Sequence, residues 1–169
     1  MRISLLIVFL FSLFLLSTCD SYDDAQSEFE QQAFQSPSNF TRTNANGQVI
    51  SEDPDDWRIS PMFQSLVRIV TPAYPNPTQN DQVFIELDIG IDDVRGLEVL
   101  TIQQSFGQSV FRELYADRRN PLPPGLLTIT IDPVNFSPNN SYEDAIGLHR
   151  VFIFDTRRNL ISYGDVMVE

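Results

Sequence analysis

The 169-residue sequence contains no lysine: all 11 of its basic residues are arginines, against 23 aspartates and glutamates. The formal net charge of -12 repels phosphate backbones and anionic lipid headgroups, so a nucleic-acid partner and polybasic docking on a membrane are excluded. An acid-rich, lysine-free composition suits high salt, where screening weakens the repulsion between surface charges. We therefore expect a marine or halophilic bacterial source.

Cysteine and histidine are each present once, as Cys19 and His149. This scarcity excludes zinc ribbons, disulfide frameworks and most metal clusters built from these ligands. A Ser/His catalytic pair would have to use His149, but no Gly-x-Ser-x-Gly turn presents a serine, and we expect an ordinary residue at a strand end. No spacing of the acids singles out a carboxylate pair for glycoside hydrolysis. We therefore expect no enzymatic activity, no cofactor and no metal.

The N-terminus lacks an apolar run long enough to cross a membrane. Residues 3–16 are apolar and follow the basic Arg2. Such a run spans roughly 21 Å as a helix, less than the roughly 30 Å of a hydrocarbon core, so a signal peptide is the better interpretation. The following Leu16-Ser17-Thr18-Cys19 resembles a bacterial lipobox. The resemblance implies a signal peptide over residues 1–18 and acylation of Cys19; the alternative is an ordinary secretory signal.

Three aspartates follow the cysteine closely, at Asp20, Asp23 and Asp24. An aspartate directly after the acylated cysteine resembles the inner-membrane retention signal of enterobacterial lipoproteins. An acidic cluster in the first few residues resembles the surface-export signal of Bacteroidetes-type lipoproteins. We therefore expect a membrane-anchored protein of the bacterial cell envelope, with the outer membrane favoured over the inner membrane and the leaflet open.

Residues 19–56 are rich in Gln, Asn, Ser, Asp and Glu and sustain no apolar period. Burial could hardly offset the entropy of ordering such a segment, so we expect a largely disordered acidic tether with a reach of about 35 Å. One exception is residues 27–34, where Ser27-x-x-Glu30 resembles a capping box and predicts a two-turn helix. An apolar residue recurs there every four positions, at Ala25, Phe29 and Ala33.

The tether ends in the acidic stretch Glu52-Asp53-Pro54-Asp55-Asp56. Its carboxylates are ligands that Ca²⁺ prefers, but the stretch lacks the loop glycine and distal glutamate of an EF-hand. We favour a solvated linker end over a weak divalent site.

From Trp57 onward, short alternating apolar runs are separated by Pro, Gly, Asn and Asp. This pattern predicts an all-β domain over residues 57–169, a seven-stranded antiparallel Ig-like β-sandwich. The expected strands are residues 65–70, 82–89, 97–103, 109–115, 126–131, 148–154 and 160–168. We expect Gly107 to make a tight hairpin turn, Asn159 to take the left-handed conformation in the last turn, and Ser141-x-x-Asp144 to cap one helical turn.

Four motifs in residues 67–169 carry a resemblance: Pro72-Ala73-Tyr74-Pro75-Asn76-Pro77, Phe106-Gly107-Gln108-Ser109-Val110, Gly147-Leu148-His149-Arg150-Val151 and Tyr163-Gly164-Asp165-Val166. Together they resemble the Ig-like module of flagellar hook-capping proteins and of the C-terminal sorting domains of type IX secretion substrates. The resemblance implies the fold and not the sorting function, because fold alone is a weak guide to function.

The leading functional hypothesis is a non-enzymatic, lipid-anchored envelope protein that presents an Ig-like binding module. The end loops, residues 72–81, 115–125 and 133–147, would supply the contacts, with Arg118 and Arg119 as candidate charged contacts. The alternatives are a structural or adaptor subunit of an envelope secretion or motility assembly, bound by strand addition, and a carbohydrate-binding module. An envelope protein partner fits either of the first two; the oligomeric state is open.

Trp57 and Arg58 stand at the expected domain boundary, in the segment Asp56-Trp57-Arg58-Ile59-Ser60-Pro61-Met62-Phe63. One interpretation makes them an exposed aromatic anchor for a partner or a sugar ring. The interpretation we favour is a lid that packs over one end of the sandwich and buries Trp57 and Phe63. Exposure of Trp57 distinguishes the two.

Overall fold

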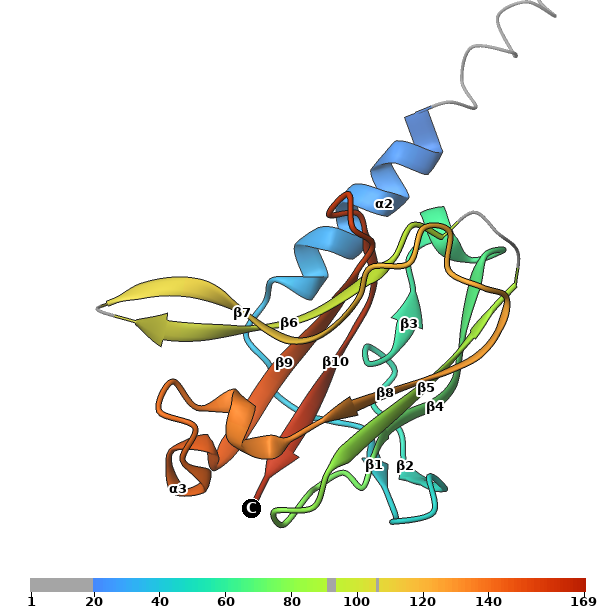
Figure 1. Cartoon of the computed structure of the whole chain (residues 1–169). Helices are drawn as coiled ribbons and strands as arrows, with labels where there is room; N and C mark the ends of the chain where they lie inside the picture. Colours follow the sequence, from blue (N-terminus) through green and yellow to red (C-terminus); the bar gives the residue numbers. More distant parts are fainter. Residues whose placement is uncertain (1–19, 91–93, 106) are drawn as a thin grey trace, which may run out of the picture.

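The computed structural model describes residues 20–90, 94–105 and 107–169. Antiparallel sheets pack as a sandwich (Figure 1), a larger one of order β3-β10-β9-β6-β7 and a smaller one of order β4-β5-β8. The strands are β3 (Arg58–Ile59), β4 (Val67–Tyr74), β5 (Val83–Ile89), β6 (Leu97–Ser105), β7 (Gln108–Asp117), β8 (Gly125–Ile131), β9 (Gly147–Phe154) and β10 (Leu160–Val168). All seven expected strands are confirmed, as β4 to β10, and the two-residue β3 is additional.

The core lies between the two sheets and follows the alternation seen in the sequence. On β5, every second residue is buried and the residues between are half-buried. Ile129 and Ile131 on β8 lie opposite Ile85 and Val83 and are fully buried. Because burying one such side chain contributes about 1.5–3 kcal/mol, a core of this kind holds without a disulfide.

Strand β7 forms the edge of the larger sheet and runs with β6 as a long hairpin that projects beyond the sandwich (Figure 1). Gly107 has a φ of 77° in its turn, which confirms the expected role of this glycine. Two apolar side chains of β7 remain exposed, Val110 at 42% and Phe111 at 48%. The edge of the sheet is therefore apolar along part of its length.

The turn between β9 and β10 differs from expectation. Arg158, with a φ of 69°, takes the left-handed conformation that we expected at Asn159. The carboxylate of Asp155 sets the turn, since it accepts hydrogen bonds from the backbone N–H groups of Arg157 (2.9 Å) and Asn159 (2.8 Å). Asn159 also donates its side-chain amide to this carboxylate at 2.8 Å, so its polar side chain braces the turn.

Residues 20–56 differ from the expected tether. They form helix α2 (Asp20–Ala33) and a small sheet of β1 (Arg42–Thr43) and β2 (Val49–Ser51). Thr41 and Thr43 are buried, and the Thr43 hydroxyl donates to the carbonyl of Ala73 at 2.7 Å. The segment is ordered because it packs on the sandwich, which supplies the apolar burial that the segment alone lacks.

Helix α2 is also longer than the two turns expected from residues 27–34, since it extends from Asp20. Ser27 therefore lies inside the helix instead of capping it. Side-chain pairs four residues apart support the helix, for example Gln26 donating to Glu30 at 2.8 Å. Asp23 and Asp24 lie in its first two turns, where negative charge is favourable to a helix.

The domain boundary packs down as the favoured interpretation predicted. Trp57 is 7% exposed and Phe63 is 3% exposed, and both belong to the core. The Trp57 ring lies against Gly164 on β10, where an added Cβ would stand 2.2 Å from the ring. The interpretation of Trp57 as an exposed aromatic anchor is therefore wrong. The carbohydrate-binding alternative thereby loses the residue on which it rested.

Asn76 ties three parts of the chain together and is fully buried. Its side-chain amide donates to the carbonyls of Thr41 (2.8 Å) and Asp165 (2.9 Å), and its Oδ1 accepts the N–H of Met167 at 2.9 Å. All the hydrogen-bonding groups of the amide are thus used, as a buried amide requires. The Pro72–Pro77 motif therefore anchors the segment before β1 to β10.

The remaining elements are short: η1 (Pro61–Phe63), η2 (Pro133–Phe136) and α3 (Tyr142–Ala145). Helix α3 confirms the expected helical turn, but Ser141 makes no side-chain cap and donates its hydroxyl to Glu143 at 2.8 Å. Within the part of the chain that the structure describes, none of the helices has the length and apolarity needed to cross a bilayer.

Candidate functional site

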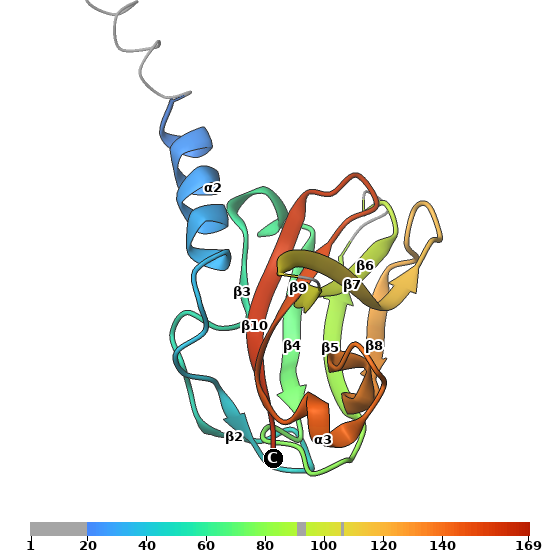
Figure 2. The ribbon, with the colours of Figure 1, turned by 90° about the vertical axis from the view of Figure 1, so that its left-hand side faces the viewer.

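Helix α2 packs on the outer face of the larger sheet, opposite to the core. Its Phe29 and Ala33 are buried in a second apolar cluster (Figure 2 shows α2 beside β3 and β10). The sheet contributes Leu100, Phe152, Phe154, Leu160 and Tyr163 to this cluster. The Phe29 ring lies 5.1 Å from that of Tyr163, measured between centroids. The helix therefore covers an aromatic surface that an antiparallel sandwich would otherwise expose.

Arg150 on β9 holds the C-terminal end of α2. Its Nη1 donates to three backbone carbonyls there: Gln32 (3.3 Å), Ala33 (3.1 Å) and Gln35 (3.1 Å). The same guanidinium makes a bidentate pair with the buried carboxylate of Asp165, through Nε at 2.7 Å and Nη2 at 2.6 Å. A cation at a helix C-terminus is favourable because the last carbonyls carry partial negative charge.

Arg58 on β3 contacts α2 from the other side. Its Nη2 donates to the side-chain oxygen of Gln32 at 2.6 Å and to the hydroxyl of Tyr163 at 2.9 Å. The guanidinium also lies 5.7 Å from the centroid of the Phe29 ring and 3.5 Å from a carboxylate oxygen of Asp55. Arg58 therefore joins α2, β10 and the loop before β3.

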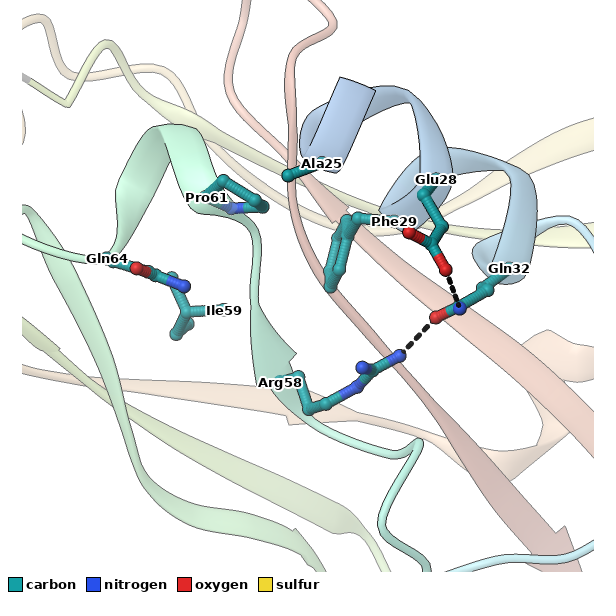
Figure 3. A pocket seen from close by; sticks show the side chains of 8 residues that line it. All are labelled: Ala25, Glu28, Phe29, Gln32, Arg58, Ile59, Pro61 and Gln64. Carbon is teal, nitrogen blue, oxygen red and sulfur yellow. Dashed lines mark hydrogen bonds between the residues drawn. The ribbon is translucent and has the colours of Figure 1, made fainter. Parts of the chain in front are cut away.

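A groove of ≈ 530 Å³ opens between α2 and the segment β3–η1 (Figure 3), and we call it the Arg58 groove. One wall is a single face of α2; the other comes from the sandwich. The lining residues are Ala25, Glu28, Phe29 and Gln32 on the helix and Arg58, Ile59, Pro61 and Gln64 opposite. The groove thus combines an apolar floor with one cation, one carboxylate and two amides.

A second, smaller hollow of ≈ 200 Å³ lies at the C-terminal end of α2, and we call it the acidic hollow. Its charged lining consists of Asp53, Asp55, Asp56, Arg150 and Asp165. Among the described residues, no three His, Cys, Asp or Glu side chains converge as metal ligands. The favoured interpretation of a solvated linker end is wrong for Asp56, which is 7% exposed.

Asp56 is the most perturbed acid of the hollow. Burial raises the pKa of its carboxyl from 3.8 to about 7, and the nearby charges of Asp165 and Asp53 add to this. The N–H of Thr41, which donates to the carboxylate at 2.8 Å, and the charge of Arg150 act in the opposite direction. Burial likewise raises the pKa of Asp165, against the pull of Arg150. The Asp56 carboxyl, near the C-terminal end of α2, therefore titrates close to neutral pH.

His149 lies near the start of β9 and has a structural role, as expected. Its ring stacks on Phe136 with 4.7 Å between centroids, and its Nε2 lies 2.7 Å from the carbonyl oxygen of Ala145. Burial lowers the pKa of the imidazole, which favours the neutral form. The side chain joins β9 to α3 and η2.

The structure separates the residues that the sequence singled out. Trp57 points into the core, whereas its neighbour Arg58 lines the groove. Arg118 and Arg119 are exposed and pair locally, Arg118 with Glu113 at 3.1 Å and Arg119 with Asp117. Neither arginine lines the groove or the hollow. Cys19 lies outside the described residues.

Sequence reasoning missed most of the surroundings of α2, notably Arg150, Tyr163 and Asp165. The available signal was the apolar repeat that contains Phe29 and Ala33, which is the face that docks. Nothing local to β9 or β10 indicates that Arg150 binds a helix more than 110 residues earlier in the chain, or that Asp165 holds this arginine.

No protein-family model matches the chain, and no curated protein matches it. Two solved structures are similar to part of the chain. Both are crystal structures of β-glucosidase from Listeria innocua, one in complex with glucose and one with gluconolactone. The glucose complex has a TM-score of 0.44 and 14% identity, and the gluconolactone complex has 0.44 and 15%. Both alignments cover 72% of this chain and 16% of the glucosidase chain. The chain is a β-rich domain that resembles a small part of that enzyme.

Proposed function

We propose that the chain is a non-enzymatic lipoprotein of the bacterial cell envelope, anchored by acyl chains on Cys19, that presents an Ig-like β-sandwich as a binding module. The observation that carries the proposal is the position of α2. The helix extends from Asp20, the residue after Cys19, and its first turns project beyond the sandwich (Figure 1). Its later turns dock on the larger sheet.

This arrangement replaces a flexible tether by a rigid spacer. A helix of 14 residues is about 21 Å long, shorter than the reach expected of a disordered segment. Aromatic contacts and Arg150 hold the docked part, so the helix that would follow the lipid anchor has a fixed orientation on the sandwich. Membrane binding by two or more acyl chains is firm enough for such a role. The outer membrane is favoured, because Asp23 and Asp24 belong to an acidic cluster after the cysteine.

The Ig-like assignment rests on the motifs of residues 67–169 and is supported by the antiparallel sandwich that they form. The Arg58 groove and the end loops are the surfaces on which such a module would bind.

Metabolic labelling tests the anchor. The full-length chain is expressed in a bacterial host with a palmitate analogue, beside Cys19→Ala and the control Ser17→Ala. Label should appear in the wild type and the control, disappear in Cys19→Ala, and fractionate with outer membranes. An unlabelled wild type in the soluble fraction would refute the proposal.

The adaptor role is the second candidate, and the edge strand β7 favours it. This ten-residue edge strand contains no proline and exposes Val110 and Phe111, so the stretch before Arg112 offers apolar side chains to an added strand. Size-exclusion chromatography of solubilised native membranes should then show a large stable complex. The variant Val110→Arg should not form this complex. Elution at the size of the protein alone would count against the adaptor.

A further inference from the structure

We propose that the Arg58 groove binds a small zwitterion with an apolar side chain, of the kind that a free α-amino acid or a dipeptide provides. The inference deepens the binding-module role proposed above by naming a ligand class, and it does not depend on the lipid anchor. It rests on the size of the groove, its apolar walls and the placement of its two opposite charges.

The groove has the size and lining of a small-molecule site. Its volume of ≈ 530 Å³ lies inside the roughly 300–1,000 Å³ range of such sites. Phe29 and Ala25 on α2 face Pro61 across it, while Ile59 lies near Gln64 on the far side of β3 (Figure 3). These side chains give an apolar ligand side chain a surface on which it can leave water.

Arg58 closes one end of the groove and supplies the positive charge (Figure 3). Its Nε and Nη2 are used in hydrogen bonds, whereas its Nη1 makes none with the described residues. The side chain is 40% exposed, so the free donor is accessible to a ligand carboxylate. Asp55 lies 3.5 Å from the guanidinium but its own side chain is 76% exposed, and a ligand can displace it.

Glu28, on the α2 wall opposite Arg58, supplies the negative charge. Gln32 lies between the two charges, donating to Glu28 at 3.4 Å and accepting from Arg58 at 2.6 Å (Figure 3). The side-chain amide of Gln32 therefore bridges the Glu28 carboxylate and the Arg58 guanidinium. A ligand with a single charge would be attracted by one group and repelled by the other, whereas a zwitterion matches both.

Ligand binding also has a structural consequence. One wall of the groove belongs to α2 and the other to β3 and η1, so a ligand that contacts both walls ties the helix to the sandwich. The free energy of unfolding therefore rises with the logarithm of the ligand concentration once this exceeds the dissociation constant. Trp57, the only tryptophan, is the neighbour of Arg58 and reports on binding through its fluorescence.

The test is isothermal titration calorimetry on the full-length chain in detergent, with Trp57 fluorescence as a second readout. The probes are leucine and leucyl-leucine, beside 4-methylpentanoate, which lacks the ammonium, and 3-methylbutylamine, which lacks the carboxylate. At least one zwitterion should bind, and each single-charge analogue should bind at least about tenfold more weakly. The tighter of leucine and leucyl-leucine identifies the free amino acid or the peptide as the source.

Two variants locate the site. Glu28→Gln keeps a polar side chain and should weaken zwitterion binding by about tenfold while leaving binding of 4-methylpentanoate unchanged or stronger. Arg58→Gln should do the reverse for 3-methylbutylamine, with circular dichroism confirming the fold. Matched controls on exposed positions outside the groove, Glu52→Gln and Arg68→Gln, should bind like the wild type.

Absence of heat and of a fluorescence change with both zwitterions at millimolar concentration would overturn the inference. Equal binding of a zwitterion and its single-charge analogues would also overturn it, as would unchanged binding in Glu28→Gln. Palmitate labelling is a separate measurement, so a failure of the anchor proposal and a failure of the groove proposal are distinguishable.

Discussion

Replacing Asp56 by asparagine should change how the stability of the protein depends on pH. The folded chain holds this carboxyl buried, with a pKa raised from 3.8 to about 7, chiefly by burial. Between these two values the folded state keeps the proton and the unfolded state releases it. The free energy of unfolding therefore falls as the pH rises from about 4 to about 7, and this contribution is constant at higher pH.

The magnitude follows from the two pKa values. The difference between 3.8 and about 7 corresponds to about 4 kcal/mol, since each tenfold change in an acid constant is about 1.4 kcal/mol. An asparagine side chain cannot ionise, and its Oδ1 can still accept the N–H of Thr41. Asp56→Asn should therefore be about as stable as the wild type near pH 4 and about 4 kcal/mol more stable at pH 8.

The assay is urea unfolding of the full-length chain at several pH values between 4 and 8, followed by Trp57 fluorescence. The control is Glu52→Gln, an exposed acid of the same stretch, which should retain the slope of the wild type. Burial also raises the pKa of Asp165, so the free energy of unfolding of both the wild type and Asp56→Asn depends on pH. The difference between these two proteins isolates the contribution of Asp56. If Asp56→Asn and the wild type have the same pH dependence, Asp56 does not titrate as a buried acid and the argument fails.

Four further outcomes are expected from the same unfolding assay. Gly164→Ala places a Cβ 2.2 Å from the buried Trp57 ring and should cost about 2 kcal/mol, whereas full stability would show that the ring can move. Arg150→Met leaves Asp165 buried without its partner and should cost about 3 kcal/mol; a neutral effect would mean that other groups hold α2. Phe29→Ala should cost about 3 kcal/mol and speed amide exchange in α2 selectively, an effect that uniform exchange would contradict. Finally, added NaCl at neutral pH should stabilise this chain of net charge -12, and equal stability with and without salt would undermine the high-salt hypothesis.

The seven main strands could be predicted because their signal is local. In β5, four buried apolar residues alternate with Phe84, Glu86 and Asp88, and such a pattern indicates a strand with one face in the core. The burial of Trp57 was predicted on similar grounds, since an apolar cluster at a boundary packs down. Gly107 was predicted because few residues fit its turn.

The surroundings of α2 could not be predicted, because they depend on distant parts of the chain. Asp56 belongs to an acidic run that looks solvated, and it is buried only because α2 and the segment before β1 close over it. The bonds from Arg150 to α2 span more than 110 residues, and no local pattern in β9 encodes them. Arg158 has the left-handed conformation because the Asp155 carboxylate binds the backbone N–H of Asn159, and this hydrogen bond sets the geometry of the turn.

The docking of α2 has a mechanical consequence. Tension applied to the chain ahead of Asp20 would travel down a hydrogen-bonded rod and load the Phe29–Tyr163 contact and the Arg150 bonds together. Shearing several contacts at once requires more force than peeling them one at a time. The sandwich would thus resist a pull on its N-terminal side, and the first event under load would be the release of the helix, with the strands still folded.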